Sequence, residues 1–193
     1  MMKKLGGCLL IVVVLLGVGM WYALREARQS LGPDGIARVT IGASPHRVYT
    51  SLSDGDSIAT WMTPGSTVTT SRRGPLAVGD TIRVQLRKAF GPARRPLLWR
   101  VAELVPDQLV ALQLMNEKNT QVIAARRDSL VAVGDSTLVM SLVSSSLPDT
   151  AKSTSAIAGD MMLSMFGVQA KLELQSLKAR IEGRPVVNPG ARK

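Results

Sequence analysis

The chain has 193 residues, enough for one domain of ordinary size and an additional segment. Its single cysteine, Cys8, excludes an intramolecular disulfide and a thiolate metal cluster, and its single histidine excludes a His-rich zinc site. A net charge of +10 is compatible with binding to nucleic acid or an anionic membrane, or with a solvated basic exterior. Aromatic residues make up only 4% of the chain, and no RNP-like aromatic motif accompanies the arginines, so we expect no nucleic-acid partner.

The first apolar segment predicts a membrane anchor. Residues 1–4 form a basic tail, and residues 5–24, which begin at Leu5 and end at Leu24, carry no charge. A helix of this length spans roughly 30 Å, the thickness of the hydrocarbon core. The following WYALREARQ lacks the small-residue exit of a cleaved signal peptide, and the lipobox-like LGGC precedes the apolar run instead of following it. We therefore expect an uncleaved, single-pass transmembrane helix.

The basic residues that flank this segment bear on its orientation. Lys3 and Lys4 precede it, and Arg25, Arg28 and Arg38 follow it, so the positive-inside bias nearly cancels. Because a very short basic tail usually stays in the cytoplasm, we favour an extracytoplasmic domain over a cytoplasmic one. Anionic lipid head groups would be a natural partner, at about 1 kcal/mol per nearby basic residue.

The folded domain is predicted at residues 36–183, after a polar linker at 25–35. IARVTIGA alternates as a strand. Ser44 and Pro45 suit the start of a short helix that ends near Ser53. A second short helix is expected from about Asp56, with Asp56 as its cap, and TPG at 63–65 ends it.

The rest of the domain reads as strands followed by one long helix. Closely spaced breaks separate the strands and predict antiparallel hairpins, at 67–72, 81–90, 97–105, 108–115, 121–130 and 136–144. Residues 153–183 contain no proline and have apolar residues at helical spacing, namely Leu163, Phe166, Ala170, Leu174, Leu177 and Ile181. Gly167 marks a weak point or a place of close packing in this helix. Residues 184–193 form a basic tail.

These elements predict an α+β fold in which a curved antiparallel sheet of about seven strands wraps round the long C-terminal helix. The segments IGASPHRVYTSLSDGDSIATWM, PLAVGDTIRVQL, RVAELVPDQLVAL, VGDSTLVMSLV and LQSLKARIE resemble, in this order, the START-like helix-grip domains of the polyketide cyclase, dehydrase and lipid-transport superfamily (SRPBCC). The resemblance extends from Ile36 to Glu182. It implies a helix-grip fold and binding of hydrophobic ligands such as sterols, phospholipids or polyketides. A minority of the family are enzymes and some assist chaperones, but no shared catalytic residue can be carried over.

Five apolar side chains are candidates for lining the space between sheet and helix: Trp61, Trp99, Met115, Met161 and Met165. Methionine suits an adaptable apolar surface. The same side chains would equally serve as core packing. On the strand at 81–90, Arg83 and Arg87 alternate with aliphatic residues, so we expect the arginines to face water. A shifted register would instead turn them toward a ligand carboxylate or phosphate.

Candidates for catalysis or metal binding are weak. His46 lies at an exposed position of the first short helix, and Asp54-Gly55-Asp56 offers too few oxygen ligands for a calcium loop. No G-x-S-x-G motif is present. No spacing brings together a carboxylate pair from Glu103, Glu117 or Asp128. We therefore predict no catalytic residue, no metal site and no cofactor.

The leading hypothesis is a membrane-anchored START-like domain that binds an apolar small molecule or lipid without catalysis. One alternative is a polyketide-cyclase-like enzyme, which requires at least two ionisable side chains converging in the cavity. Another is an assembly or interaction protein with a filled core, which docks a membrane partner through a basic face at Arg94-Arg95 or Arg126-Arg127.

Overall fold

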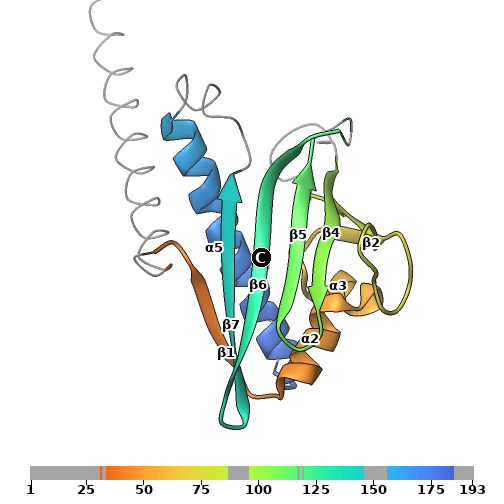
Figure 1. The fold of residues 1–193 in the computed structure, drawn as a ribbon, viewed down its shortest axis with the longest axis vertical. Helices are drawn as coiled ribbons and strands as arrows, with labels where there is room; N and C mark the ends of the chain where they lie inside the picture. The colour runs from red at the N-terminus through yellow and green to blue at the C-terminus, as the bar shows by residue number, and fades with distance from the viewer. Residues whose placement is uncertain are drawn as a thin grey trace, which may run out of the picture.

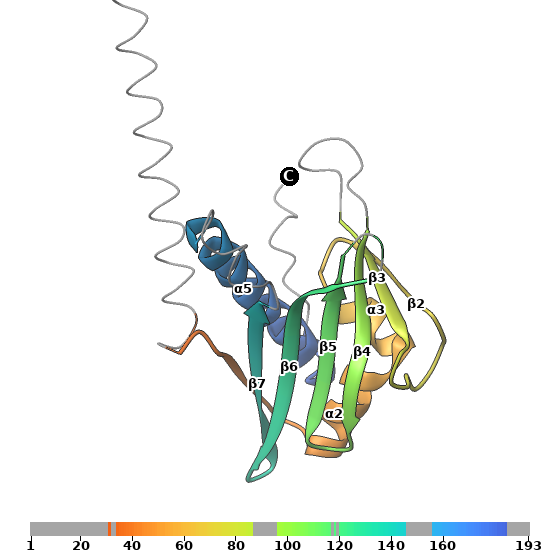
Figure 2. The same ribbon diagram turned by 45° about the horizontal axis from the view of Figure 1, so that its top comes forward.

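A single antiparallel sheet curls around the C-terminal helix (Figures 1 and 2). The computed structural model describes residues 31, 34–86, 96–116, 118, 120–145 and 156–184. For residues 156–163 it describes the backbone only. The helix, α5, covers Ala156–Ile181. The seven strands run in the order β1-β7-β6-β5-β4-β3-β2, with bounds β1 Ala37–Ile41, β2 Thr67–Thr70, β3 Thr81–Gln85, β4 Leu97–Val105, β5 Leu109–Met115, β6 Val122–Val133 and β7 Ser136–Ser145. The predicted α+β class and seven-stranded antiparallel sheet are confirmed.

The order of the strands in the sheet follows the sequence, except for β1. Strands β2 to β7 are neighbours in the sheet in the order of the sequence, as the short breaks predicted, and β1 joins beside β7. The predicted strand at 67–72 was too long, because β2 ends at Thr70, and the one at 121–130 was too short, because β6 continues to Val133.

The predicted transmembrane helix at residues 5–24 lies outside the described residues, as do the tails at 1–4 and 185–193. Among the described residues, none of the helices combines the length and apolar character that a membrane span requires.

Two short helices, α2 (Pro45–Ser53) and α3 (Gly55–Trp61), follow β1. Ser44 caps α2 as predicted: its hydroxyl accepts a hydrogen bond from the Arg47 N–H at 3.4 Å. The predicted cap of α3 was wrong. Asp54 holds that position and accepts from the Ser57 N–H at 2.9 Å, because the one extended residue between the two helices is Asp54.

The two aspartates in this turn therefore have different tasks. Asp56 lies in the first turn of α3 and its carboxylate accepts from the Gly74 N–H at 3.2 Å. Gly55, between them, is required by close packing, since a Cβ there would lie 2.5 Å from the carbonyl oxygen of Arg72. The segment that connects α2 and α3 is thus tied to the turn before Pro75.

Replacing Asp54 with alanine is expected to cost about 1 kcal/mol of the free energy of unfolding, because it removes a helix N-cap. Asp56→Ala, two residues away, should cost less, about 0.5 kcal/mol, because its exposed carboxylate accepts one hydrogen bond, from the Gly74 N–H. Urea unfolding of the two variants checks this difference. Equal losses would contradict the assignment of Asp54 as the cap.

The core lies between the inner face of the sheet and one face of α5. The predicted apolar positions Ala170, Leu174, Leu177 and Ile181 are buried, and α5 packs against β1, β7 and α3. Gly167 marks close packing, the second of its two expected roles: a Cβ there would lie 2.8 Å from Leu31, whose side chain is itself buried.

Candidate ligand-binding site

Trp61 lies in the packed part of the core. Its side chain is 2% exposed, and its indole Nε1–H donates to the Ser51 carbonyl oxygen at 3.0 Å. Because this bond joins the end of α3 to α2, the indole holds the helix pair together. The side chains of Val48, Leu52 and Ile58 belong to the same buried cluster.

Trp99 lies on the inner face of β4 and reaches the helix. It is 6% exposed, and its ring meets that of Phe166 on α5 edge to face, with ring centroids 6.3 Å apart and an interplanar angle of 83°. This contact bridges the space between β4 and α5. Trp99 is thus the predicted lining residue that the structure places at the sheet–helix interface.

Met115 and Met165 do not gather with it. Met115 neighbours Leu114, whose side chain is in the core cluster, so Met115 points to the opposite, outer face of the sheet. Met165 is 60% exposed. The side chain of Met161 lies outside the described residues.

A pocket of about 480 Å³ opens at one end of the sheet. We call it the rim pocket; it is lined by Arg83, Pro96, Leu97, Leu98, Met115, Asn116 and Ile123. These residues come from the end of β3, the start of β4, the end of β5 and the start of β6, which pair side by side. Leu97 and Ile123 also pack against the core cluster. The rim pocket therefore reaches from the outer face to the edge of the interior.

Arg83 supplies the cationic group of this pocket. Its neighbours Ile82 and Val84 are fully buried, and Arg83 is exposed on the other face. The expected register of the aliphatic residues is confirmed, and Arg83 still borders a concave site. Arg87 lies outside the described residues.

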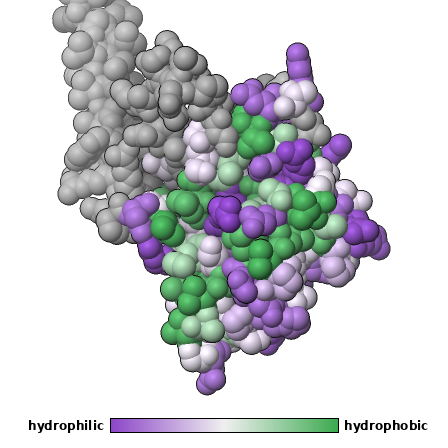
Figure 3. Space-filling model, in the orientation of Figure 1, coloured by the Kyte–Doolittle hydropathy of each residue, from purple (hydrophilic) through white to green (hydrophobic). Residues whose placement is uncertain are grey.

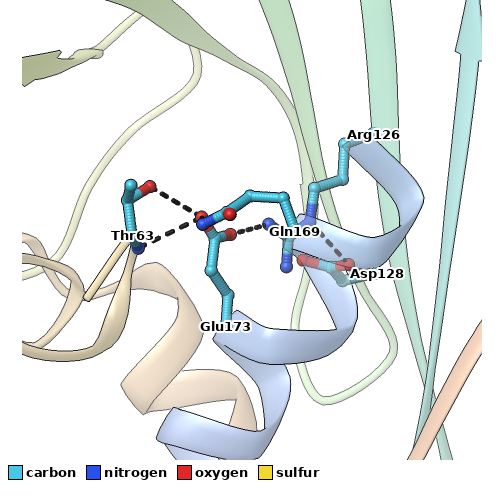
Figure 4. A network of polar contacts seen from close by, with 5 residues as sticks. All are labelled: Thr63, Arg126, Asp128, Gln169 and Glu173. Carbon is cyan, nitrogen blue, oxygen red and sulfur yellow. Dashed lines mark hydrogen bonds and ion pairs between the residues drawn. The ribbon is translucent and has the colours of Figure 1, made fainter. Parts of the chain in front are cut away.

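A buried polar cluster bridges the sheet and α5 (Figure 4). We call it the Arg126 network; its members are Thr63, Arg126, Asp128, Gln169 and Glu173. Arg126 is 2% exposed and Asp128 1% exposed, both on the inner face of β6. Arg126 Nε donates to Asp128 Oδ1 at 3.0 Å, and Arg126 Nη1 donates to Glu173 Oε2 across to the helix.

Glu173 connects this ion pair to the loop after α3. Its Oε1 accepts from Thr63 N–H at 3.1 Å, from the Thr63 hydroxyl at 2.7 Å and from Gln169 Nε2 at 3.0 Å. Thr63 has a φ of 48°, in the left-handed region that is unfavourable for a β-branched residue. The two bonds from Glu173 hold the loop in that conformation.

The guanidinium of Arg126 keeps unused hydrogen-bonding capacity. Burial alone lowers the pKa of Arg126, but the charges of Asp128 and Glu173 outweigh it and raise that pKa above its usual value. The side chain is therefore charged at every physiological pH. Its Nη2 is buried and has no hydrogen-bond partner among the described residues. Buried unpaired donors are rare and costly.

The sequence alone did not predict this cluster, and Arg126 was expected on a basic outer face with Arg127. That placement of Arg126 was wrong, although Arg127 is indeed outward and pairs with Glu103 at 3.2 Å. A signal was present in the alternation of β6, where Arg126 and Asp128 share a face with the apolar Ala124 and Leu130.

The structure also places the weak catalytic candidates, His46 and the carboxylates Glu103 and Asp128. The side chain of His46 is 79% exposed and its Nδ1 lies 3.0 Å from Asp107 Oδ1, so it is a surface residue, as predicted. Glu103 lies on the outer face beside Arg127, whereas Asp128 is buried on the inner face, so these two carboxylates form no pair. Glu117 lies outside the described residues.

The outer face of the sheet carries hydrophobic areas (Figure 3). Val131 and Val133 of β6 and Leu142 of β7 are 44%, 53% and 42% exposed. Val131 and Val133 lie toward the β6–β7 hairpin, at the opposite end of the sheet from the rim pocket, whereas Leu142 pairs with Arg127 in the middle of β6. This surface bears on the interaction alternative, since exposed apolar side chains often mark contact sites.

Solved structures with the same architecture support the fold. No protein-family model and no curated protein sequence matches the chain. The Aha1 dimer from Colwellia psychrerythraea is 24% identical, with a TM-score of 0.53 over 76% of this chain and 94% of that one. CalU16 from Micromonospora echinospora is 17% identical, with a TM-score of 0.52 over 78% and 74%. A protein from Arthrobacter aurescens is 13% identical, with a TM-score of 0.56 over 82% and 91%.

These likenesses concern the fold, because the identities are all below 25%. They agree with the seven-stranded curled sheet and the C-terminal helix packed against it. The chain therefore has an α+β, helix-grip-like fold, in which the curled sheet packs against the C-terminal helix.

Proposed function

We propose that this chain is a membrane-anchored helix-grip domain that binds an apolar small molecule or lipid and catalyses no reaction. The observation that carries the proposal is the rim pocket, whose apolar walls include two residues of the core margin, Leu97 and Ile123. Its volume of about 480 Å³ lies within the usual range of small-molecule sites. The ligand would enter there and extend between the sheet and α5.

The membrane part of the proposal rests on residues 5–24, between Leu5 and Leu24. A domain tethered in this way would take its ligand from, or deliver it to, the adjacent bilayer. The net charge of +10 favours contact with anionic head groups. The short basic tail before the anchor favours an extracytoplasmic domain.

Filling the rim pocket is the direct test. We expect full-length wild-type protein, incubated with a lipid extract, to retain an apolar molecule that native mass spectrometry detects. Leu98→Trp, which places an indole in the pocket, should reduce the retained fraction at least tenfold. Leu142→Trp makes the same change on the same outer face, on β7, a strand that contributes no residue to the pocket lining, and should retain as much as wild type. No retained molecule in wild type, or equal retention in both variants, would refute the proposal.

The cyclase-like alternative has one observation in its favour. Arg126, Asp128 and Glu173 are ionisable groups that converge between the sheet and α5. Against it, Glu173 Oε1 already accepts three hydrogen bonds and Oε2 accepts from Arg126, so this carboxylate is poorly placed to take a proton from a substrate. The enzyme would be favoured if wild-type protein changes the mass of the retained molecule on incubation and the Glu173→Gln variant leaves that mass unchanged.

A further inference from the structure

We propose that the Arg126 network selects the ligand of this domain: it accepts neutral molecules that carry a hydrogen-bond acceptor, such as a ketone, an ester or a hydroxyl, and rejects carboxylates and phosphates. This inference rests on the binding function proposed above. The Arg126 network would bind the polar end of the ligand, whereas the rim pocket would bind its apolar body.

The donor is Arg126 Nη2. Arg126 donates from Nε to Asp128 and from Nη1 to Glu173, and in the part of the chain that the structure describes its buried Nη2 meets no acceptor. A guanidinium N–H that loses water without a new partner carries a full desolvation cost. An acceptor atom on a bound molecule removes that cost, which makes the acceptor a requirement for tight binding.

The formal charge of the network decides against an anion. Among the described residues, one guanidinium faces two carboxylates, Asp128 and Glu173, so the formal charge of these three side chains sums to −1. A ligand carboxylate would add a second uncompensated negative charge in an apolar interior, where an unpaired ion is strongly disfavoured. A neutral carbonyl or hydroxyl oxygen satisfies Nη2 and adds no charge.

The sheet register connects this donor to the rim pocket. Arg126 lies opposite Leu112, which lies opposite Val101, and this row is two residues along β4 from Trp99 and four from Leu97. Four residues of strand correspond to about 13 Å along β4, and the two strand spacings from β4 to β6 add about 10 Å across the sheet. A ligand whose apolar body lies along Leu97 and Trp99 would bring its acceptor to Arg126. The Trp99–Phe166 contact lies on this path and has to open for it.

Three probes of equal chain length test the selection on the full-length protein: a long-chain methyl ketone, the corresponding alkane and the corresponding fatty acid. We expect wild type to bind the ketone at least tenfold more tightly than either of the others, because one hydrogen bond to a charged donor is worth about that factor. Displacement of a fluorescent apolar reporter gives the three dissociation constants. Arg126→Lys keeps a cation for the two carboxylates, removes Nη2, and should abolish the preference. Arg127→Lys on the outer face should keep it.

The outcomes separate this inference from the proposed function. If none of the probes binds wild type, both fail. If all three bind with similar affinity, the domain binds apolar molecules and the selection by Arg126 is wrong; this comparison needs no variant. Fatty acid bound as tightly as ketone, and lost with Arg83→Gln, would also overturn the inference, because it would place the polar end at Arg83 in the rim pocket.

Discussion

Replacing Arg126 with methionine is expected to lower the free energy of unfolding by about 3–5 kcal/mol. Methionine leaves Asp128 and Glu173 buried without a cation, and it removes the donor that holds Glu173 Oε2. The loss of Glu173's position should also release Thr63, whose left-handed backbone depends on two bonds from that carboxylate. Urea unfolding of the full chain, followed by circular dichroism, measures the loss.

The neighbouring residue provides the matched control. Arg127→Met changes the same residue type one position along β6, but the Arg127–Glu103 pair is about half exposed on the outer face. Such pairs contribute about 0–1 kcal/mol. A loss of similar size in both variants would contradict the buried position of Arg126.

A compensated variant distinguishes unpaired charge from lost packing. Arg126→Met combined with Asp128→Asn and Glu173→Gln removes the cation and both anions together. Replacing a whole buried ion group is often neutral in stability, whereas removing one partner is not. We therefore expect the triple variant to recover most of the stability that Arg126→Met loses. If it is no more stable than Arg126→Met, the loss comes from packing.

The sequence predicted those features that depend on neighbouring residues. Ser44 before Pro45 signals a helix start because the cap bond spans only three residues. The helical spacing of Ala170, Leu174 and Leu177 predicts the buried face of α5 because one long helix has only one face to offer the sheet. Their positions needed no knowledge of distant contacts.

The error at Asp56 arose because the local sequence offers two possible caps. Both Asp54 and Asp56 precede the apolar residues of α3, and either side chain can cap a helix. Only the extended backbone at Asp54 decides between them. That conformation depends on the bridge between Asp54 and Pro75, which lie far apart in the sequence.

The candidate site depended more strongly on tertiary structure. In β5, LVALQLM has apolar residues on both faces and Gln113 as its one polar residue, so alternation does not indicate where Met115 points. Arg126 and Glu173 have polar side chains at positions with apolar neighbours, and charged residues are seldom buried unless paired. Recognising them as partners requires knowing that β6 and α5 face each other.

Substitution of Trp61 is expected to have the second large effect on the free energy of unfolding. Comparing its effects on stability and on ligand affinity decides whether Trp61 contacts a ligand or has a structural role. Trp61→Ala should cost about 3–5 kcal/mol, because it empties a position that is 2% exposed in the core. Trp61→Phe keeps an aromatic ring and loses the hydrogen bond to the Ser51 carbonyl oxygen, which should cost about 1–3 kcal/mol. Urea unfolding of both variants measures these losses.

Trp99 provides the comparison that separates the two roles. If Trp61 only joins α2 to α3, Trp61→Phe should leave the affinity for an apolar reporter unchanged while it lowers stability. Trp99→Leu removes the ring that meets Phe166 beside the proposed ligand path, and it should change that affinity. A weakened affinity in Trp61→Phe, under conditions where the protein stays folded, would return Trp61 to the ligand site. The position of Trp61 beside Ser51, away from the residues that line the rim pocket, favours the structural role.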